Sequence, residues 1–341
     1  MLSEALKKVI EFSDLSEQEM AEAIAEIMDG KASDASIAAF LTALRMKGET
    51  VDEITGAARL MREKAIPLSV QSRNGLLDIV GTGGDSANTF NISTVAAFVA
   101  AGAGVRVAKH GNRSVSSRCG SADVMEALGI VITLSPAGVA TCIDEVGIGF
   151  LFAPTFHVAM RHVAPVRKAL GIRTIFNILG PLTNPSDADL LLVGVYDSEL
   201  SGTIAQVLQR LGKKRVLVVR SNDGLDEISV SAPTQVWELK ENTISHWVLN
   251  PEAYGIPLHS RDAIRGGTAH DNAAIIEAVL RGKPGPYRDC VLLNAGAALM
   301  AADRVNNVKD GIRVAAAAID SGAAIEKLMA LKKLSQKLAS Q

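Results

Sequence analysis

The hydrophobic pattern of the chain changes its period once, near residue 75, and this change limits what the chain can fold into. Before it, apolar residues recur at helical spacing without a strand-like stretch, in the runs 2–12, 20–28, 37–46 and 54–61. After it, short apolar runs alternate with helical segments. We therefore predict an α/β protein, with a small helical N-terminal domain and a larger α/β domain that has a mainly parallel central sheet.

Local signals support helices in the first part. Ser16 and Thr50 are each followed three positions later by a glutamate, the pattern of a capping box, and Gly30 and Gly48 stand where helices should end. Residues 64–75 contain a proline and several polar residues, so they are predicted to link the two domains.

In the second part, eight apolar runs are predicted as strands: residues 77–80, 105–108, 130–134, 148–153, 190–195, 216–219, 235–239 and 244–249. Helices are predicted among them at 94–103, 122–128 and 203–211, and an amphipathic helix at 325–338. Parallel sheets bind ligands beyond the carboxyl ends of their strands, so polar segments that follow strands are the candidate binding loops.

Composition excludes several classes of protein. The chain has 341 residues, with 35 Lys and Arg against 37 Asp and Glu, so its net charge of -2 gives no general attraction to nucleic acid or anionic lipid. No export signal or membrane-spanning run is present, and the three cysteines form no CxxC pair. We expect a cytoplasmic protein with no nucleic-acid or membrane partner, in which the cysteines are small core residues.

The sharpest local signal is the segment GTGGD at residues 81–85, which follows a predicted buried strand. Its glycines allow a sharp turn and close approach to an anion, and Ser93 and Thr94 at the next helix start add hydroxyl groups. A phosphate fits such a loop, but so does a plain tight turn. The loop is neither a GxxxxGK[ST] motif nor a dinucleotide fingerprint, because no acidic residue follows about 20 positions later.

A second polar loop, residues 109–123, follows the next predicted strand. It contains Lys109, Arg113, Arg118 and four serines, a mixture of charge and hydroxyl donors that suits pyrophosphate. An exposed basic loop is the alternative. Because both loops follow strand ends, we expect them to face one cleft.

Together these segments resemble the signature of the anthranilate phosphoribosyltransferase family, within the nucleoside phosphorylase and phosphoribosyltransferase superfamily. The resemblance rests on GTGGD at 81–85, KHGNR at 109–113 and GSAD at 120–123, and it continues through His157, Arg167, the run 171–185 and DGLDE at 223–227. It extends over essentially the whole chain. Cys119 departs from it, since serine is expected there, and sulfur is a weaker hydrogen-bond donor.

The resemblance implies a helical domain at residues 1–66, completed by a returning segment at about 155–183, and an α/β domain at 74–341 that binds phosphoribosyl pyrophosphate (PRPP). It implies transfer of the phosphoribosyl group from PRPP to the amine of anthranilate in tryptophan biosynthesis, with Mg²⁺ as cofactor. It also leaves room for association with other enzymes of that pathway.

The resemblance further assigns a role to individual residues. Those at PRPP-binding positions are Gly81, Gly83, Gly84, Asp85, Thr89, Asn91, Ser93, Thr94, Lys109, Asn112 and Ser121. Those at anthranilate-binding positions are Gly81, Asn112, His157 and Arg167, and those at magnesium positions are Ser93, Asp226 and Glu227. No residue is assigned as a catalytic acid or base, because the neutral aromatic amine needs mainly positioning.

From residue type alone, each of these assignments has a plainer alternative. Asp226 and Glu227 also fit a solvated turn, so we expect them to be solvent-exposed. Arg167 also fits a surface helix, and His157 a packing residue; His110 and His162 are expected to be structural.

Two other functions share parts of this pattern. A pyrimidine nucleoside phosphorylase would have the same fold and a glycine-plus-lysine phosphate site, but KHGNR and the acidic pair disfavour it. A non-catalytic nucleic-acid-binding relative is disfavoured by the net charge. The many apolar helical positions in so small a domain also predict a homodimer joined through the helical domain.

Overall fold

A computed structural model of the chain describes residues 1–72, 75–85, 87–114 and 118–340. The first part is helical, as predicted, and consists of α1 (Leu2–Ile10), α2 (Glu17–Met28), α3 (Asp34–Lys47) and α4 (Val51–Lys64). Both predicted capping boxes form, at Ser16 with Glu19 and at Thr50 with Glu53. Gly48 ends α3 with a φ of 90°.

The second part contains a seven-stranded sheet. Its strands are β1 (Leu76–Gly81), β2 (Arg106–Gly111), β3 (Ile148–Phe152), β4 (Leu190–Gly194), β5 (Arg215–Ser221), β6 (Thr234–Lys240) and β7 (Thr243–Leu249). Their order across the sheet is β3-β2-β1-β4-β5-β6-β7. The first five strands run parallel and the last two antiparallel, so the predicted α/β class with a mainly parallel sheet is confirmed.

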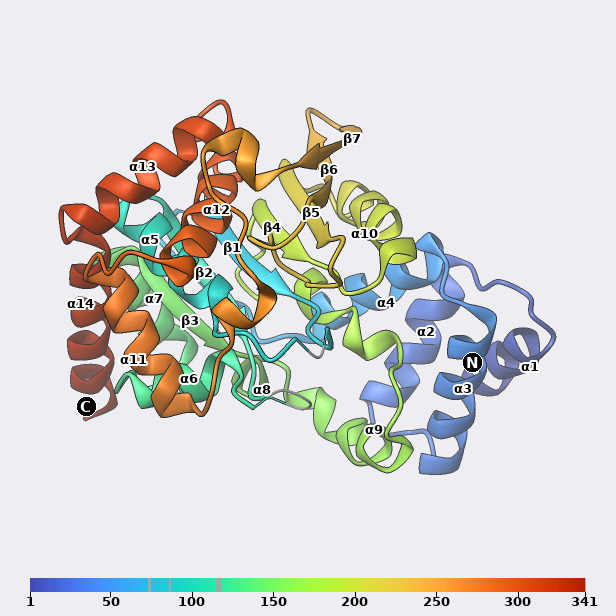
Figure 1. The fold of residues 1–341 in the computed structure, drawn as a ribbon. Coiled ribbons are helices and arrows are strands. Elements are labelled where there is room, and N and C mark those ends of the chain that lie inside the picture. Colours follow the sequence, from blue (N-terminus) through green and yellow to red (C-terminus); the bar gives the residue numbers. More distant parts are fainter. Residues whose placement is uncertain (73–74, 86, 115–117, 341) are drawn as a thin grey trace.

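The remaining helices surround the sheet (Figure 1). They are α5 (Ile92–Gly102), α6 (Ser121–Ala127), α7 (Pro136–Val146), α10 (Ser198–Arg210), η4 (Pro251–Tyr254), η5 (Arg261–Ile264), α11 (Ala269–Leu280), α12 (Pro286–Ala301), α13 (Val308–Asp320) and α14 (Ala323–Ala339). A returning segment with α8 (Ala153–Phe156), η1 (Val158–His162), α9 (Ala164–Leu170), η2 (Ile175–Asn177) and η3 (Gly180–Leu182) runs back toward α3.

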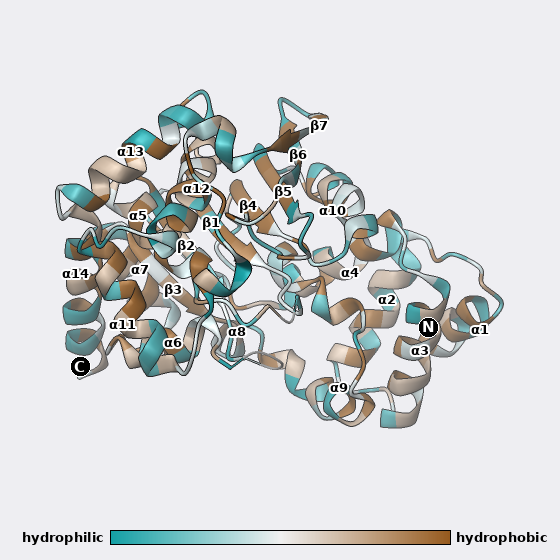
Figure 2. Cartoon of the chain, viewed as in Figure 1, coloured by the Kyte–Doolittle hydropathy of each residue, from teal (hydrophilic) through white to brown (hydrophobic). Residues whose placement is uncertain are grey.

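Alternate residues of the central strands supply two different cores. Leu190 and Leu192 of β4 pack on one face with α5 and α12, whereas Leu191 and Val193 pack on the other with α10 and the helical part. Both faces of the sheet are therefore covered, and Figure 2 shows hydrophobic residues along its central strands. None of the helices in the described residues is long and apolar enough to span a bilayer.

One predicted strand is wrong. Residues 130–134 join no sheet, although Ile130, Ile132 and Leu134 are buried in alternation. The backbone N–H of Val131 donates to Ser335 Oγ of α14 over 3.1 Å. The segment has the period of a strand because it lies over the core, but its polar backbone pairs with helices.

Candidate active site

The carboxyl ends of β1 and β4 meet at the point where the sheet order reverses, because β1 has β2 on one side and β4 on the other. These strands end at Gly81 and Gly194. A Cβ at Gly81 would lie 2.7 Å from Asp226 Oδ2, and one at Gly194 would overlap the carbonyl oxygen of Asp226. The absence of side chains at both strand ends therefore lets Asp226 approach the sheet.

The glycine loop after β1 is bound to this acid. Gly83 and Gly84 have φ values of 67° and 84°, which favour glycine, and the N–H of Gly83 donates to Asp226 Oδ2 over 2.7 Å. The carbonyl of Gly84 accepts from the guanidinium of Arg173, which also lies 4.0 Å from the centre of the Tyr196 ring. Sequence reasoning missed Arg173; the only signal for it is its place in the run 171–185.

The acidic pair is buried, so the expectation that both residues face solvent is wrong. Asp226 is 8% exposed and Glu227 is partly buried, because the loop that carries them lies over the strand ends. Burial raises the pKa of Asp226 well above its usual value, and the nearby charges of Asp85 and Glu227 raise it further. Burial also raises the pKa of Glu227 to about 7, against the opposing effect of Lys109.

Lys109 is the buried cation of this cluster and is 2% exposed. Its Nζ donates to the carbonyl of Ile79 over 2.6 Å and to Ser93 Oγ over 3.2 Å. Burial lowers the pKa of Lys109, while the charges of Asp78 and Glu227 oppose that change. Ser93, in the first turn of α5, also hydrogen-bonds to Glu227 through its backbone and side chain. The structure thus brings Lys109, Ser93 and the acidic pair together beside the start of a helix.

Three further predicted positions lie beside α5. Asn91 precedes the helix, and its Oδ1 accepts from Asn272 of α11 over 2.9 Å and from the thiol of Cys119 over 3.4 Å. The thiol of Cys119 is thus the donor to Asn91 at a position where the resemblance leads us to expect a serine hydroxyl. Thr94 is fully buried, and its hydroxyl has no partner among the described residues. Thr89 pairs through its backbone with Arg265.

The loop after β2 is held to α6. Ser121 Oγ donates to the carbonyl of Asn112 over 3.3 Å, so these two predicted residues are neighbours. Arg113 forms ion pairs with Asp123 and Glu126, 3.0 and 2.5 Å long. Its charge is thus directed to α6 rather than to the glycine loop. Residues 115–117 of this loop lie outside the described residues.

His157 and Arg167 lie on the returning segment. The His157 residue is 5% exposed, and its ring lies 5.3 Å from the His110 ring. Burial lowers the pKa of His157 to about 4 and that of His110 to about 3, so both rings are neutral at pH 7. Arg167 lies 5.7 Å from the centre of the Phe176 ring, and no ion pair joins it to any residue that the structure describes.

The residues at this site fit a magnesium ion whose coordination is completed by oxygen atoms of a bound ligand. Across the described ranges no group of three or more His, Cys, Asp and Glu side chains is arranged to hold a metal by itself. However, Asp226 and Glu227 are adjacent buried carboxylates whose repulsion raises the pKa of Asp226. Magnesium commonly binds through one or two carboxylates, waters and substrate phosphate oxygens, and these residues supply the protein part of that set.

Comparison with protein families defines the class. Residues 3–65 match the helical bundle domain of the glycosyl transferase family, and residues 73–325 match the a/b domain of the same family. The chain therefore belongs to the glycosyl transferase family.

Individual relatives narrow the class. The chain is 54% identical over 336 residues to the anthranilate phosphoribosyltransferase of Symbiobacterium thermophilum, covering 98% of each chain. It superimposes on the Thermus thermophilus enzyme with a TM-score of 0.92 at 44% identity, covering 97% of this chain and 99% of that one. The Saccharomyces cerevisiae enzyme in complex with PRPP and Mg gives 0.91 at 30% identity, covering 98% of each. The chain belongs to the anthranilate phosphoribosyltransferase family and is thus an enzyme, a pentosyltransferase.

Proposed function

We propose that the chain transfers the phosphoribosyl group of PRPP to the amine of anthranilate, giving N-(5-phosphoribosyl)anthranilate and pyrophosphate in tryptophan biosynthesis. The observation that carries this proposal is the meeting of a glycine loop, a buried lysine and two buried acids at the carboxyl end of β1. That set provides anion donors and metal-binding carboxylates without a nucleophile placed to compete with the amine.

The PRPP site that we propose uses both strand-end loops. The backbone N–H group of Gly84, with the start of α5, binds phosphate oxygens, while the N–H of Gly83 donates to Asp226, and Lys109 provides the positive charge. The other proposed PRPP residues are Gly81, Asp85, Thr89, Asn91, Ser93, Thr94, Asn112 and Ser121.

Mg²⁺ is the proposed cofactor, held by Ser93, Asp226 and Glu227. When bound, it neutralises charge on the leaving pyrophosphate. Asp226 also holds the glycine loop in place, because its carboxylate accepts a hydrogen bond from the N–H of Gly83.

The proposed anthranilate path is lined by Gly81, Asn112, His157 and Arg167. Arg167 has no carboxylate partner among the residues described, so its guanidinium is available for the substrate carboxylate. The neutral His157 ring, with one N–H donor and one acceptor nitrogen, orients the substrate and transfers no proton in the reaction. The Saccharomyces cerevisiae enzyme in complex with 4-fluoroanthranilate supports an aromatic acid as the acceptor.

A direct assay tests the function. Purified protein with PRPP, anthranilate and Mg²⁺ should consume anthranilate and release pyrophosphate, and EDTA should stop the reaction. The control replaces PRPP with a pyrimidine nucleoside and phosphate. Turnover of the nucleoside without turnover of PRPP would contradict the proposal.

We also propose how the chain is organised in the cell. The helical domain comprises residues 1–66 with the returning segment 155–183, and the α/β domain 74–341; in support, Val166 and Phe176 pack in the same core as Phe40. A homodimer forms through the helical domain, where Phe12 and Met46 are exposed. The proposed location is the cytoplasm, and the resemblance leaves room for association with other enzymes of the tryptophan pathway.

A further inference from the structure

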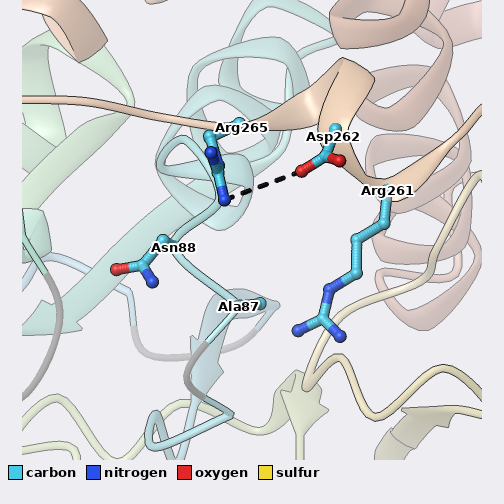
Figure 3. Close-up of a pocket in the computed structure, with 5 residues that line it drawn as sticks. All are labelled: Ala87, Asn88, Arg261, Asp262 and Arg265. Atoms are coloured by element: carbon cyan, nitrogen blue, oxygen red, sulfur yellow. Dashed lines mark ion pairs between the residues drawn. The ribbon is translucent and has the colours of Figure 1, made fainter.

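A surface cavity of about 270 Å³ lies beside the proposed PRPP site and includes none of its residues. It is lined by Ala87, Asn88, Arg261, Asp262 and Arg265. Figure 3 shows both guanidinium groups directed from the η5 segment toward the loop that carries Ala87 and Asn88. Because one water occupies about 30 Å³ of the liquid, the cavity has room for several waters or a small polyanion.

The charges in this cavity favour an anion. Arg265 has one side-chain partner among the described residues, Asp262, at an N–O distance of 3.7 Å, and both side chains are mostly exposed. Arg261 donates one hydrogen bond, from Nη1 to the carbonyl of Asp223 over 3.2 Å. Each guanidinium has five N–H donors, so most of the donors that face the cavity have no acceptor in the described protein.

The cavity lies between the segment that follows the glycine loop and the loop that leads to Asp226. The backbone of Arg265 pairs with that of Thr89, and the N–H of Gly266 donates to the carbonyl of Asn88 over 2.9 Å. On the other side, Arg261 holds the loop that leads to Asp226 through its bond to Asp223. The two arginines therefore adjoin segments that lead to the glycine loop and to the acidic pair.

We propose that Arg261 and Arg265 form a second anion site that binds inorganic pyrophosphate, without magnesium, as it leaves the glycine loop. The inference rests on the proposed function, because that reaction makes pyrophosphate. Two arginines spaced across one cavity match a diphosphate, which offers oxygen atoms at both ends, better than a single phosphate.

Calorimetric titration of the full chain with sodium pyrophosphate in EDTA tests this site. Low ionic strength is used, because salt at 0.1 M screens exposed charges beyond about 10 Å. We expect Arg265→Ala to weaken binding about tenfold and Arg261→Ala with Arg265→Ala to abolish it, consistent with the loss of charged hydrogen bonds. Asp262→Asn should tighten binding about threefold, because it removes the negative charge beside Arg265. Inorganic phosphate should bind more weakly than pyrophosphate.

Arg265→Ala is the cleanest variant, since its side chain makes no hydrogen bond to either loop among the contacts described. Arg281→Ala with Arg313→Ala removes the same charge from the residue that follows α11 and from α13, and it should leave pyrophosphate binding unchanged. In the transfer assay, the double pocket variant should change the KM for PRPP less than twofold.

Pyrophosphate binding with the same affinity and stoichiometry in the double pocket variant as in wild type, or equal affinity for phosphate, would overturn the inference. A parallel rise in the KM for PRPP would also overturn it, because the arginines would then belong to the PRPP site. A third result would separate the two proposals. If the wild-type protein has no transferase activity but binds pyrophosphate through Arg261 and Arg265, the proposed function is contradicted and the anion site is supported.

Discussion

Asn184 Nδ2 donates a hydrogen bond to Asp78 Oδ2 over 2.7 Å, in the interior of the protein directly behind the candidate site. The same amide group donates to the carbonyl of Ala108 over 2.8 Å, and the N–H of His110 donates to Asp78 Oδ1 over 3.2 Å. Asn184 and Asp78 thereby link β1 to the two residues of β2 that flank Lys109. Burial raises the pKa of Asp78 to about 6, although Lys109 and these hydrogen bonds lower it.

The raised pKa of Asp78 predicts a pH-dependent stability. The folded protein holds this proton up to about pH 6 and the unfolded chain releases it near pH 3.8, so the stability that Asp78 contributes falls as pH rises between these values. A shift of about two pKa units corresponds to about 3 kcal/mol. The free energy of unfolding of Asp78→Asn should therefore rise relative to that of wild type between pH 4 and pH 7. Urea denaturation of both proteins at the two pH values measures this difference.

The Asn184→Ala variant should show the opposite effect, a loss of stability, in the same urea denaturation. It leaves the buried carboxylate without one donor, and its cost should be about 3 kcal/mol at pH 7 and smaller at pH 4, where Asp78 is protonated. Equal costs at both pH values would contradict the assigned titration.

Arg167→Ala should separate substrate binding from folding. We expect the KM for anthranilate to rise by one to two orders of magnitude, about 1.5–3 kcal/mol for a charged hydrogen bond, with the KM for PRPP nearly unchanged. The melting temperature should stay close to that of wild type, because no ion pair of Arg167 is lost among the described residues. If the KM values for both substrates rise together, Arg167 does not act on anthranilate.

Charged residues in the helical domain should break the proposed dimer. Phe12 and Met46 are 66% and 72% exposed at the ends of α1 and α3, which pack against each other. Phe12→Glu with Met46→Glu should give a monomer by light scattering at micromolar concentration, whereas Met329→Glu, at a 53% exposed position on α14, should remain dimeric. A wild-type monomer, or a double variant that stays dimeric, would contradict this interface.

Local patterns predicted much of the fold because each has a local cause. The Ser16 and Glu19 side chains satisfy the first turn of α2, and Gly48, with a φ of 90°, ends α3. By contrast, α12 has no amphipathic stripe, since every residue from Cys290 to Ala301 is buried, and the sequence analysis did not specify it. Its helix depends on burial against α5 and α13, which is a tertiary effect.

The sequence predicted which residues meet at the site better than it predicted their burial and the charges around them. Lys109, Ser93 and the acidic pair do meet, but the burial of Asp226 depends on Gly194, which is 32 residues away and was not considered. Arg173 was missed for the same reason, because its partners Gly84 and Tyr196 come from two different loops. Contacts between distant segments set the electrostatics, and a single sequence does not display them.

The burial of the acidic pair sharpens its mutational test. Asp226→Asn with Glu227→Gln removes two carboxylates whose raised pKa values show that their charged forms oppose folding. Without magnesium, the variant should therefore be at least as stable as wild type, by a margin that grows as pH rises from 5 to 8. This sign follows because each wild-type carboxyl contributes less stability as it loses its proton.

Magnesium should reverse the order of stability. Magnesium should raise the melting temperature of wild type by mass action and leave that of the variant unchanged. The transfer rate of the variant should collapse, because it lacks an ion that stabilises charge in the transition state by several kcal/mol. Thermal melting and rate measurements across a magnesium titration read both effects. Arg281→Ala, far from the acids in sequence and exposed, is the control and should respond to magnesium as wild type does. A double variant with wild-type rate and the same magnesium dependence would place the metal elsewhere, since no buried acid would remain at positions 226 and 227 to bind it.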